Sequence, residues 1–317
     1  MNDLKIPVKA DIEAAYEKIK PYVHKTPVLS SSLLNEMFSA ELYFKCENFQ
    51  KVGAFKFRGA TNAVLSLSEE ELSRGLVTHS SGNHAAAVSL AAKMRGAKAY
   101  IVMPSNSPEV KKMAVAGYGA EIRYCEPNLK AREDTANEII KETGATFIHA
   151  YDNYNVICGQ GTTGLELVNE YPDLDAVIGP VGGGGLMSGI SIAVKGLVPD
   201  IKVYGAEPLG ADDAYRSLKS GKLVAHHNPD TIADGLLTTL SERTFAILGE
   251  KLDDIYTVTE ESIVKCMQLI WERMKIIIEP SSAVTLAVIA ENNRVFRNRK
   301  VGLVLSGGNV DLRNLPF

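Results

Sequence analysis

The sequence predicts an α/β protein with two open, mostly parallel, twisted sheets, each flanked by helices. Short apolar runs alternate with stretches of helical character along most of the chain, and several of these runs end in polar or glycine-rich corners. The length of 317 residues suits about two domains. Hydrophobic residues make up 45% of the chain and charged residues 23%, as in globular proteins that bury a large core.

The alternation is clearest in the block from 76 to 150. Its predicted strands are 76–81, 97–104, 120–125 and 145–150. The helices between them are predicted at 83–96, 107–119 and 129–143. Ser-Pro opens the second helix, and a glycine closes each of the first two. Three βα units in so short a stretch predict a small parallel sheet covered by helices.

A second series of strands and helices follows that block. Its predicted strands are 175–181, 201–208, 253–259 and 300–308, and its predicted helices lie within 182–196, 211–220, 261–275 and 281–293. The first strand is apolar throughout, which is typical of a strand buried on both faces. Because such elements lie on both sides of the first block, we predict an insertion. A large domain would comprise 1–68 and 154–317, and a small domain at 75–152 would close over the active site.

Charge and cysteine content exclude several classes of function. The net charge of −4, with scattered Lys and Arg, gives no indication of binding to nucleic acid or to an anionic membrane. The four cysteines form no CxxC pair, which argues against a zinc site or a disulfide framework. There is no signal-peptide pattern and no apolar stretch near the roughly 20 residues that span a bilayer. We therefore expect a cytoplasmic protein.

Four consecutive glycines stand between a buried strand and a helix, namely Gly182, Gly183, Gly184 and Gly185. Glycines let backbone N–H groups approach an anion, and a helix N-terminus adds partial positive charge, so the run predicts a phosphate cradle. It is not a P-loop, and GxGxxG is absent because Met187 and Ser188 occupy the third glycine positions. The plain alternative is a tight turn.

Three further corners carry polar side chains or glycines. "SSGNHAAA" (80–87) places donors at a helix start, where they suit a carboxylate or simply cap the helix. "GQGT" (159–162) is predicted to be a polar glycine turn. The corner "SGGN" (306–309) is as compatible with a plain turn as with part of a functional site. Together the corners predict one cleft assembled between two domains.

Lys56 lies between Phe55 and Phe57 in "GAFKFRGA". Most lysines with apolar neighbours are surface residues whose stems cover apolar area. In a partly desolvated site, however, a lysine has a lowered pKa and forms a Schiff base. A lysine of this kind together with a phosphate cradle is what pyridoxal 5′-phosphate requires.

Glu207 and Asp213 are six residues apart in "AEPLGADDA". Two carboxylates, a carbonyl between them and water would suit a hard cation such as Mg²⁺, Mn²⁺ or Ca²⁺. By spacing alone, an acidic solvated loop is the favoured interpretation.

Five motifs in order, "FQKVGAFKFRGA", "SSGNHAAA", "GPVGGGGLMSG", "IADG" and "LSGGNVDL", resemble the fold-type II pyridoxal-phosphate enzymes, which have a tryptophan synthase β-like fold. Within that group the chain looks most like the serine racemase and serine/threonine dehydratase family. The resemblance runs from Thr26 to Leu312, and the ordered set of motifs is far more specific than any one of them.

The resemblance implies roles for the matching residues. Lys56 would hold the cofactor covalently and act as the base on one face of the substrate Cα. The other implied cofactor contacts are Phe55 against the ring, Asn83 on the ring oxygen, Gly182, Gly183, Gly184, Gly185 and Leu186 on the phosphate, and Ser306 at the ring nitrogen. The implied contacts to the substrate carboxylate are Ser80, Ser81, Asn83 and His84.

Ser81 separates the branches of this family. Threonine dehydratases usually have alanine at this position, whereas in serine racemases a serine serves as the acid and base on the opposite face. The resemblance also implies a divalent cation held by Glu207, the carbonyl of Ala211 and Asp213, and a homodimer. We therefore expect racemisation and α,β-elimination of a small β-hydroxy amino acid, with serine as the first candidate.

One segment departs from the family pattern. Where many relatives have His-Pro followed by Phe or Asn, this chain has Ala150 and Tyr151, beside the substrate side chain in that family. Arg132 also matches a substrate-side position of racemases. The alternative is thus a dehydratase of L-threonine or 3-hydroxyaspartate with little racemase activity. Outside this family, the alternatives are a nucleotide-dependent oxidoreductase that uses the glycine run and a non-catalytic ligand-binding module.

Overall fold

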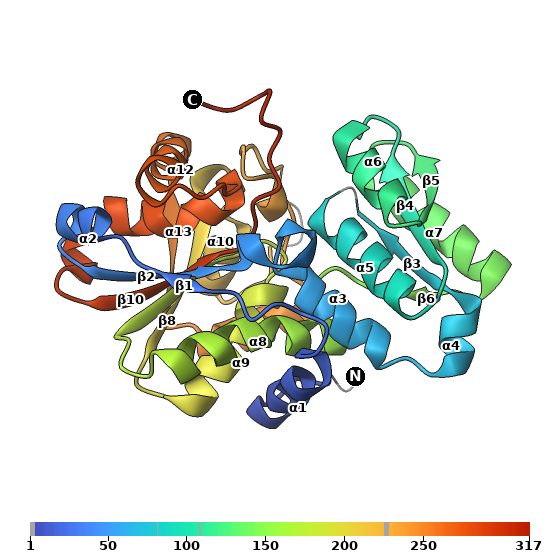
Figure 1. Cartoon of the computed structure of the whole chain (residues 1–317), viewed down its shortest axis with the longest axis horizontal. Coiled ribbons are helices and arrows are strands. Elements are labelled where there is room, and N and C mark those ends of the chain that lie inside the picture. Colours follow the sequence, from blue (N-terminus) through green and yellow to red (C-terminus); the bar gives the residue numbers. More distant parts are fainter. Residues whose placement is uncertain (1–3, 81, 108, 225–227) are drawn as a thin grey trace.

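A computed structural model of the chain describes residues 4–80, 82–107, 109–224 and 228–317. The larger of its two sheets has the strand order β1-β2-β10-β7-β8-β9 (Figure 1). β1 pairs with β2 antiparallel, and all the other pairs in this sheet are parallel. Its strands are β1 (Val28–Leu29), β2 (Glu41–Cys46), β7 (Ala176–Pro180), β8 (Lys202–Pro208), β9 (Asp254–Val258) and β10 (Lys300–Leu305).

The smaller sheet is parallel throughout and has the order β5-β4-β3-β6. Its strands are β3 (Leu76–His79), β4 (Ala99–Pro104), β5 (Glu121–Cys125) and β6 (Thr146–Phe147). All four are consecutive in the chain, whereas the larger sheet takes strands from both sides of them. The predicted α/β class with two parallel-rich sheets is confirmed, and the predicted domain boundaries stay a prediction.

Helices cover the faces of both sheets, with α3 to α7 around the smaller one (Figure 1). Their bounds are α1 (Lys9–Ile19), α2 (Ser32–Phe38), α3 (Lys56–Leu65), α4 (Glu69–Arg74), α5 (Asn83–Met94), α6 (Glu109–Gly117), α7 (Leu129–Thr143), α8 (Tyr154–Glu170), α9 (Gly185–Leu197), α10 (Asp213–Ser220), α11 (Glu242–Lys251), α12 (Glu260–Met274), α13 (Pro280–Glu291) and α14 (Asn293–Phe296). Within the described residues, no helix is both long and apolar enough to cross a bilayer.

The prediction of a turn at 159–162 is wrong, because these residues lie inside α8. Glycine disfavours helices locally, yet here it permits close packing. A Cβ on Gly159 would lie 2.6 Å from the Cα of Gly59 in α3, and a Cβ on Gly161 would lie 2.8 Å from the carbonyl oxygen of Gly189 in α9. Tertiary contact between these helices therefore overrides the local preference for a turn.

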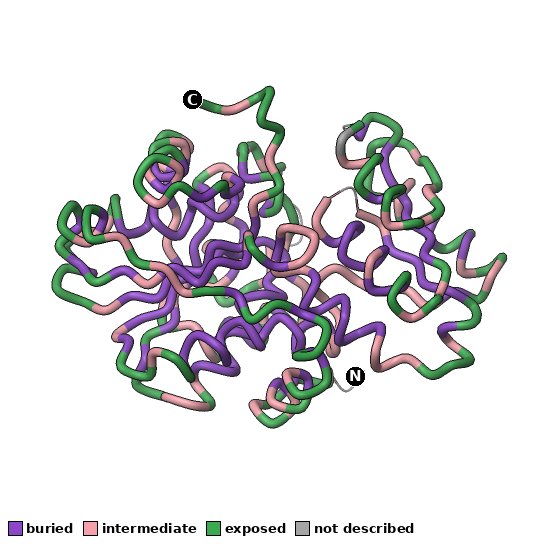
Figure 2. The backbone as a smooth tube through the Cα atoms, viewed as in Figure 1, coloured by how far each residue is buried: buried purple, intermediate pink, exposed green. Residues whose placement is uncertain are grey.

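Burial follows the layers (Figure 2). Every residue of β7 is buried, as its apolar sequence predicts, and α13 is buried from Ser281 to Ile289. The main cluster of buried side chains lies between the larger sheet, α12 and α13. This packing leaves the carboxyl ends of the parallel strands as corners where polar groups gather. β3, β7, β8 and β10 all end just before a predicted site motif.

Candidate active site

Lys56 is the first residue of α3 and is preceded by Phe55, whose ring centroid lies 5.1 Å from the lysine Nζ. The Nζ donates a hydrogen bond of 2.9 Å to the carbonyl oxygen of Ala150. Burial lowers the pKa of Lys56 to about 8, although the negative charge of Glu279 works in the other direction. This amine therefore loses its proton more readily near neutral pH than an ordinary lysine does, as a nucleophile requires.

A buried ionic cluster anchors α3 at Arg58, two residues after Lys56. The Arg58 guanidinium donates to both oxygens of Glu47 and both oxygens of Glu166, at 2.7 to 2.9 Å. Lys45 of β2 donates to Glu166 at 2.6 Å and to the carbonyl oxygen of Thr26 at 2.8 Å. Burial raises the pKa of Glu166, yet Arg58 and Lys45 together hold it below its usual value. The cluster fixes the position of α3 on α8 and β2, and with it Lys56.

Ser306 follows β10 and lies next to the Lys56 segment. Its carbonyl oxygen accepts a 2.9 Å hydrogen bond from the backbone N–H of Phe55, and the following residue, Gly307, forms a β-bridge with Ala54. The Ser306 hydroxyl is buried, 3.2 Å from the Ser282 hydroxyl. Ser282 also donates to the Gly307 carbonyl oxygen. Sequence reasoning predicted a site role for Ser306 but missed Ser282, which positions it.

Asn83, at the start of α5, is held by two partners from the other side of the cleft. The Asn309 side-chain amide donates to the carbonyl oxygen of Val52 (2.7 Å) and to Asn83 Oδ1 (2.9 Å). The Asn83 Nδ2 group donates to Glu279 Oε1 (3.0 Å) and Oε2 (3.1 Å). Because each partner can play only one role, the orientation of the Asn83 amide is determined.

Glu279 is a site residue that sequence reasoning missed. It is 3% exposed and also accepts a hydrogen bond from the backbone N–H of Asn309. Burial, reinforced by the nearby charge of Asp234, raises the pKa of Glu279 to about 7. The available signal was an acidic residue followed by Pro280 at the start of an apolar helix, a pattern that is as typical of an ordinary helix N-terminus.

The glycine run joins β7 to α9, which begins at Gly185. Gly184 has φ +83°, and a Cβ there would lie 2.7 Å from Leu240 Cδ2. The first intrahelical bond runs from Ser188 N–H to the Gly184 carbonyl, so the preceding N–H groups lack intrahelical acceptors. This is the geometry of an anion site at a helix N-terminus, and the positive φ and close contacts require glycine.

Tyr151 lies against the glycine run. A Cβ on Gly183 would be 2.3 Å from Cδ1 of its ring, and a Cβ on Gly185 would be 2.9 Å from its Cα. The ring packs edge-on against His149, with centroids 4.6 Å apart. A row of rings continues through Phe147 to His79. Burial and the charge of Arg132 lower the pKa of His79, the last ring of this row.

The other residues predicted to contact the substrate differ in their surroundings. Ser81 lies outside the described residues. The Ser80 hydroxyl accepts from the Gly82 backbone N–H at 3.3 Å. The His84 side chain is buried, with Nε2 3.0 Å from the Ile148 carbonyl oxygen, and burial lowers its pKa to about 3. The neutral ring therefore donates to Ile148, and the backbone N–H of His84 lies in the first turn of α5, before the bond from Ala86 N–H to the Gly82 carbonyl. Arg132 contacts the Asn128 carbonyl at 3.5 Å.

The predicted cation residues follow β8. Glu207 and Asp213 are both buried, as is Ala211. Glu207 accepts from the backbone N–H groups of Ala214 (3.1 Å) and Tyr215 (2.8 Å). Burial and the charge of Asp213 raise the pKa of Glu207 well above its ordinary value. Among the described residues, no group of three or more His, Cys, Asp or Glu side chains is arranged to hold a metal.

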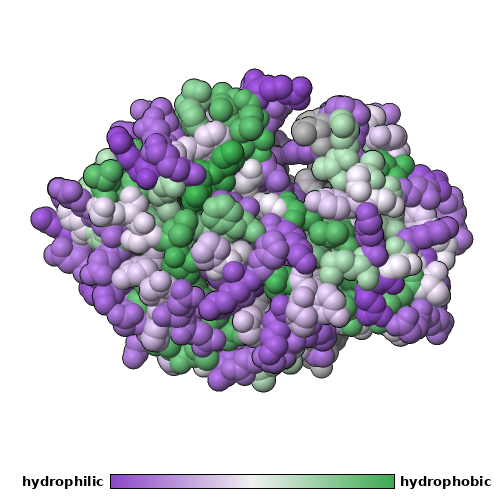
Figure 3. Space-filling model, viewed as in Figure 1, coloured by the Kyte–Doolittle hydropathy of each residue, from purple (hydrophilic) through white to green (hydrophobic). Residues whose placement is uncertain are grey.

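The contacts described above bring one set of residues together, namely Lys56, Ser306, Asn83, Glu279, Tyr151 and the glycine run. Figure 3 shows a notch in the outline of the molecule between the C-terminal segment and the small-sheet helices. A profile described as "Pyridoxal-phosphate dependent enzyme" matches residues 19–307. The chain belongs to this family. Its fold, with two parallel-rich sheets, is that of the fold-type II members, and the alternatives of a nucleotide-dependent oxidoreductase and a non-catalytic module are set aside.

Relatives within the pyridoxal-phosphate family are similar over nearly their whole lengths. Serine racemase of Dictyostelium discoideum is 54% identical over 311 residues, covering 96% of this chain and 95% of the relative. Beta-hydroxyaspartate dehydratase of Paracoccus denitrificans is 47% identical over 312 residues, covering 98% and 99%. The solved structure of maize serine racemase has a TM-score of 0.95 at 43% identity, covering 98% of this chain and 95% of that chain. A crystal structure of a threonine deaminase is also similar, with a TM-score of 0.92 at 43% identity.

The residues present fit the cofactor of this family. The fit rests on three features of the site: an amine with lowered pKa at Lys56, a glycine cradle that a Cβ would fill, and polar groups at the buried Ser306 and the half-buried Asn83. They match an aldehyde, a phosphate and the polar atoms of a pyridine ring, respectively.

Proposed function

We propose that this enzyme catalyses the pyridoxal-phosphate dependent racemisation and α,β-elimination of a small β-hydroxy amino acid, with serine as the preferred substrate. Elimination would yield a keto acid and ammonia. The single observation that carries the proposal is the Lys56 amine of lowered pKa, held beside the glycine cradle on a chain 54% identical to a serine racemase.

Lys56 would hold the cofactor covalently. Phe55 would lie against the ring, Asn83 on the ring oxygen and Ser306 on the ring nitrogen. The phosphate would bind to the backbone of Gly182–Leu186 at the start of α9. When bound, pyridoxal 5′-phosphate supplies an electron sink that acidifies the Cα–H bond of the substrate. The small inserted domain, which we propose comprises 75–152, would close over this site.

The Ser306 hydroxyl has a mechanistic consequence. A carboxylate beside the ring nitrogen would enforce a positive charge there, whereas a hydroxyl paired with Ser282 does not. Charge on Cα is then delocalised less strongly. This favours outcomes in which the Cα carbanion is short-lived, either by loss of the β-hydroxyl or by rapid return of a proton.

Two groups would handle the Cα proton. Lys56 would remove it from one face, which its lowered pKa allows near neutral pH. If the β-hydroxyl leaves, the product is an enamine that hydrolyses to a keto acid. If it stays, Ser81 would return a proton to the opposite face and invert the centre. The substrate carboxylate would meet Ser80, Ser81, Asn83 and His84 at the start of α5, where His84 offers its backbone N–H rather than its ring.

A second candidate is a dehydratase of 3-hydroxyaspartate or L-threonine. It is favoured by Arg132, whose charge reaches the ring row that leads to Tyr151, and by the dehydratase relative at 47% identity. An arginine on the substrate side would recognise a second carboxylate.

A substrate screen tests these candidates directly. The purified holoenzyme would be given L- and D-serine, L-threonine and both 3-hydroxyaspartate diastereomers, with keto acid and enantiomer followed together. We expect keto acid and inverted enantiomer from serine. Fast elimination confined to 3-hydroxyaspartate or threonine would replace the main proposal by the second, and a protein that ignores added cofactor would refute both.

Ser81 separates racemase from dehydratase. Replacing Ser81 with alanine should suppress racemisation more than elimination of L-serine, because Lys56 takes the Cα proton in elimination of that isomer and no proton is returned to the opposite face. Equal losses of the two activities would contradict a two-base mechanism. Retention of the cofactor absorbance band in S81A is the control for an intact site.

We also propose that Glu207, the Ala211 carbonyl and Asp213 bind Mg²⁺, Mn²⁺ or Ca²⁺. Two mutually repelling buried carboxylates support this, since a cation would relieve both the repulsion and the burial cost. A chelator should lower the melting temperature of the wild type, and Mg²⁺ should restore it, whereas Glu207→Gln should respond to neither. A wild type unaffected by chelation would end this assignment.

The resemblance to family members also supports a homodimer, which sedimentation analysis would test. A cytoplasmic location is proposed from the spacing of the cysteines, which suits a reducing compartment. Fractionation of the source cells would test it.

A further inference from the structure

Tyr151 lies between the two groups that define the site. The residue before it, Ala150, accepts the 2.9 Å hydrogen bond from the Lys56 amine. Its own ring lies on Gly183 in the phosphate cradle. A ligand that joins the amine to the cradle therefore passes beside Tyr151.

The phenol ring is held in place by its surroundings. The backbone N–H groups of Tyr151 (3.3 Å) and Asp152 (2.9 Å) both donate to Nδ1 of His149, and the His149 ring packs edge-on against the phenol. Asp152 is in turn paired with Arg243 at 2.7 Å. A side chain held by these contacts keeps its hydroxyl group at a defined position.

We propose that the Tyr151 hydroxyl donates a proton to the β-oxygen of the substrate as that oxygen leaves. This inference rests on the proposed function and deepens it. Lys56 takes the proton from Cα, and the Cα–H electron pair forms the Cα–Cβ double bond. The Cβ–O bond breaks with its electron pair on oxygen, the phenol proton moves to that oxygen, and water leaves. The phenolate then regains a proton from the Lys56 ammonium, so no outside reactant is consumed.

The acidity of the group suits this role. Burial, with the charges of Asp152, Asp213 and Glu133, raises the pKa of Tyr151 to about 12. The phenol is thus protonated at neutral pH, while transfer to a leaving hydroxide is downhill because water has a pKa of about 15.7. The two imidazoles in the row are poor competitors as acids. Burial lowers the pKa of His149 to about 4, and burial and Arg132 lower that of His79, so both are largely neutral.

The test compares two leaving groups in one variant. Hydroxide needs a proton to leave, whereas the chloride of β-chloro-L-alanine does not. In Tyr151→Phe, pyruvate formation from L-serine should fall by about 10²-fold or more, the range of a lost general acid. Pyruvate from β-chloro-L-alanine should stay within about threefold, and so should racemisation of L-serine, which breaks no Cβ–O bond.

Tyr154→Phe is the matched control, since it removes a phenol hydroxyl three residues away. The Tyr154 hydroxyl interacts with Asp11, and the Lys5 amine lies over the Tyr154 ring, 4.2 Å from its centroid. Pyruvate formation from serine and from chloroalanine should therefore be unchanged in this variant. Cofactor absorbance and cofactor affinity of both variants report whether the site is intact. Equal losses for serine and chloroalanine in Tyr151→Phe, or no loss for either, would overturn the assignment. A wild type without a cofactor band or turnover would instead refute the proposed function.

Discussion

A buried lysine, Lys45, and a partly buried one, Lys56, lie close together in the chain and have different surroundings. Lys45 is fully enclosed, and its amine lies 2.6 Å from Glu166 within a cluster of two cations and two carboxylates. Lys56, two residues before Arg58 of that cluster, donates to a backbone carbonyl. Burial lowers the pKa of both lysines, but at Lys45 the charges of Glu47 and Glu166 oppose this shift at close range, whereas the pKa of Lys56 falls to about 8. The paired lysine contributes to holding the fold together, whereas the lysine without a carboxylate at hydrogen-bonding distance is available for chemistry.

The carboxylates repeat this contrast. Arg58 and Lys45 hold the pKa of Glu166 low, so it is ionised and neutralised. Among the described residues, Glu279 accepts hydrogen bonds from an amide and a backbone N–H and has no ion pair, and burial and Asp234 raise its pKa to about 7. A buried charge with a counter-ion marks the scaffold here, and a buried group without one marks the site.

The largest expected effect separates the two lysines. Lys56→Ala should lose the absorbance band of the lysine-linked cofactor and about 10³-fold or more in turnover, while its melting temperature without cofactor stays close to that of the wild type. Lys45→Met should keep the band but melt earlier, because Glu166 loses one of its two cations. Borohydride reduction and peptide mass mapping would place the cofactor. A label on any residue other than Lys56 would break the comparison.

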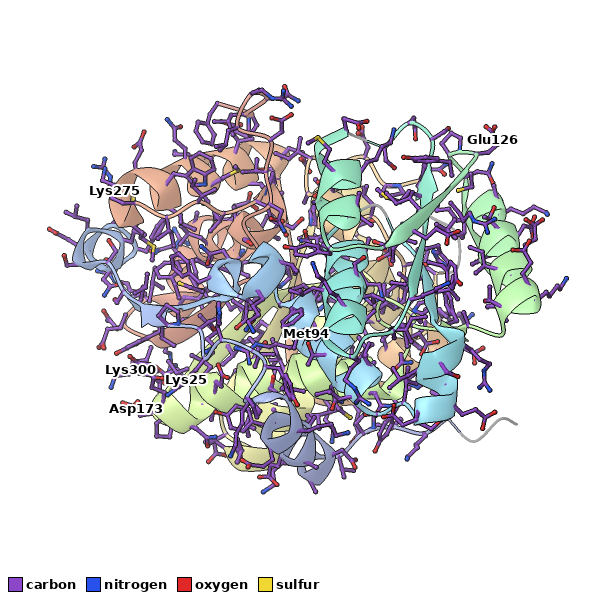
Figure 4. The ribbon with its side chains drawn as sticks, turned by 45° about the vertical axis from the view of Figure 1, so that its right-hand side comes forward. Lys25, Met94, Glu126, Asp173, Lys275 and Lys300 are labelled. Carbon is purple, nitrogen blue, oxygen red and sulfur yellow. The ribbon has the colours of Figure 1, made fainter. Side chains whose placement is uncertain are left out.

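The second effect concerns stability alone. Glu166→Gln leaves Lys45 and Arg58 with one carboxylate between them, so the free energy of unfolding should fall by about 3 to 5 kcal/mol. Glu170→Gln on the same helix is the control. Its partner Lys25 lies at the surface (Figure 4), and this pair should be worth less than about 1 kcal/mol. Denaturant titration measures both, and similar losses in the two variants would show that burial is not what matters.

The third effect is a pH dependence from Glu279. Its pKa is about 7 in the folded protein and near the ordinary value of 4.5 when unfolded, so the folded state binds more protons between these values. Stability from this group is therefore present at low pH and lost as pH rises through 7. Between pH 5 and pH 8, the cofactor-free wild type should lose about 2 to 3 kcal/mol relative to Glu279→Gln. If the free energies of unfolding of the two proteins changed with pH in the same way, Glu279 would ionise normally.

Much of the fold was predictable from local pattern. The apolar run at 175–181 became a fully buried strand, and the helix predicted at 129–143 has those same bounds. The turn predicted at 159–162 failed for a physical reason: its glycines are needed for close packing of α8 on α3 and α9, and sequence shows the glycine but not the neighbour. Glu279 and Ser282 were missed because their partners, Asn83 and Ser306, are 196 and 24 residues away.

The sequence by itself determined the alternation of strands and helices, the family, and the residues suited to a lysine-bound cofactor and its phosphate. These features depend on residue type and short spacing, which the chain displays directly. Only the tertiary structure decided the ionisation of Lys56, the neutral ring of His84, the raised pKa of Glu279 and the position of Tyr151 on the glycine cradle. Each of these depends on burial and on partners brought from distant parts of the chain, and both exist only once the two sheets have come together.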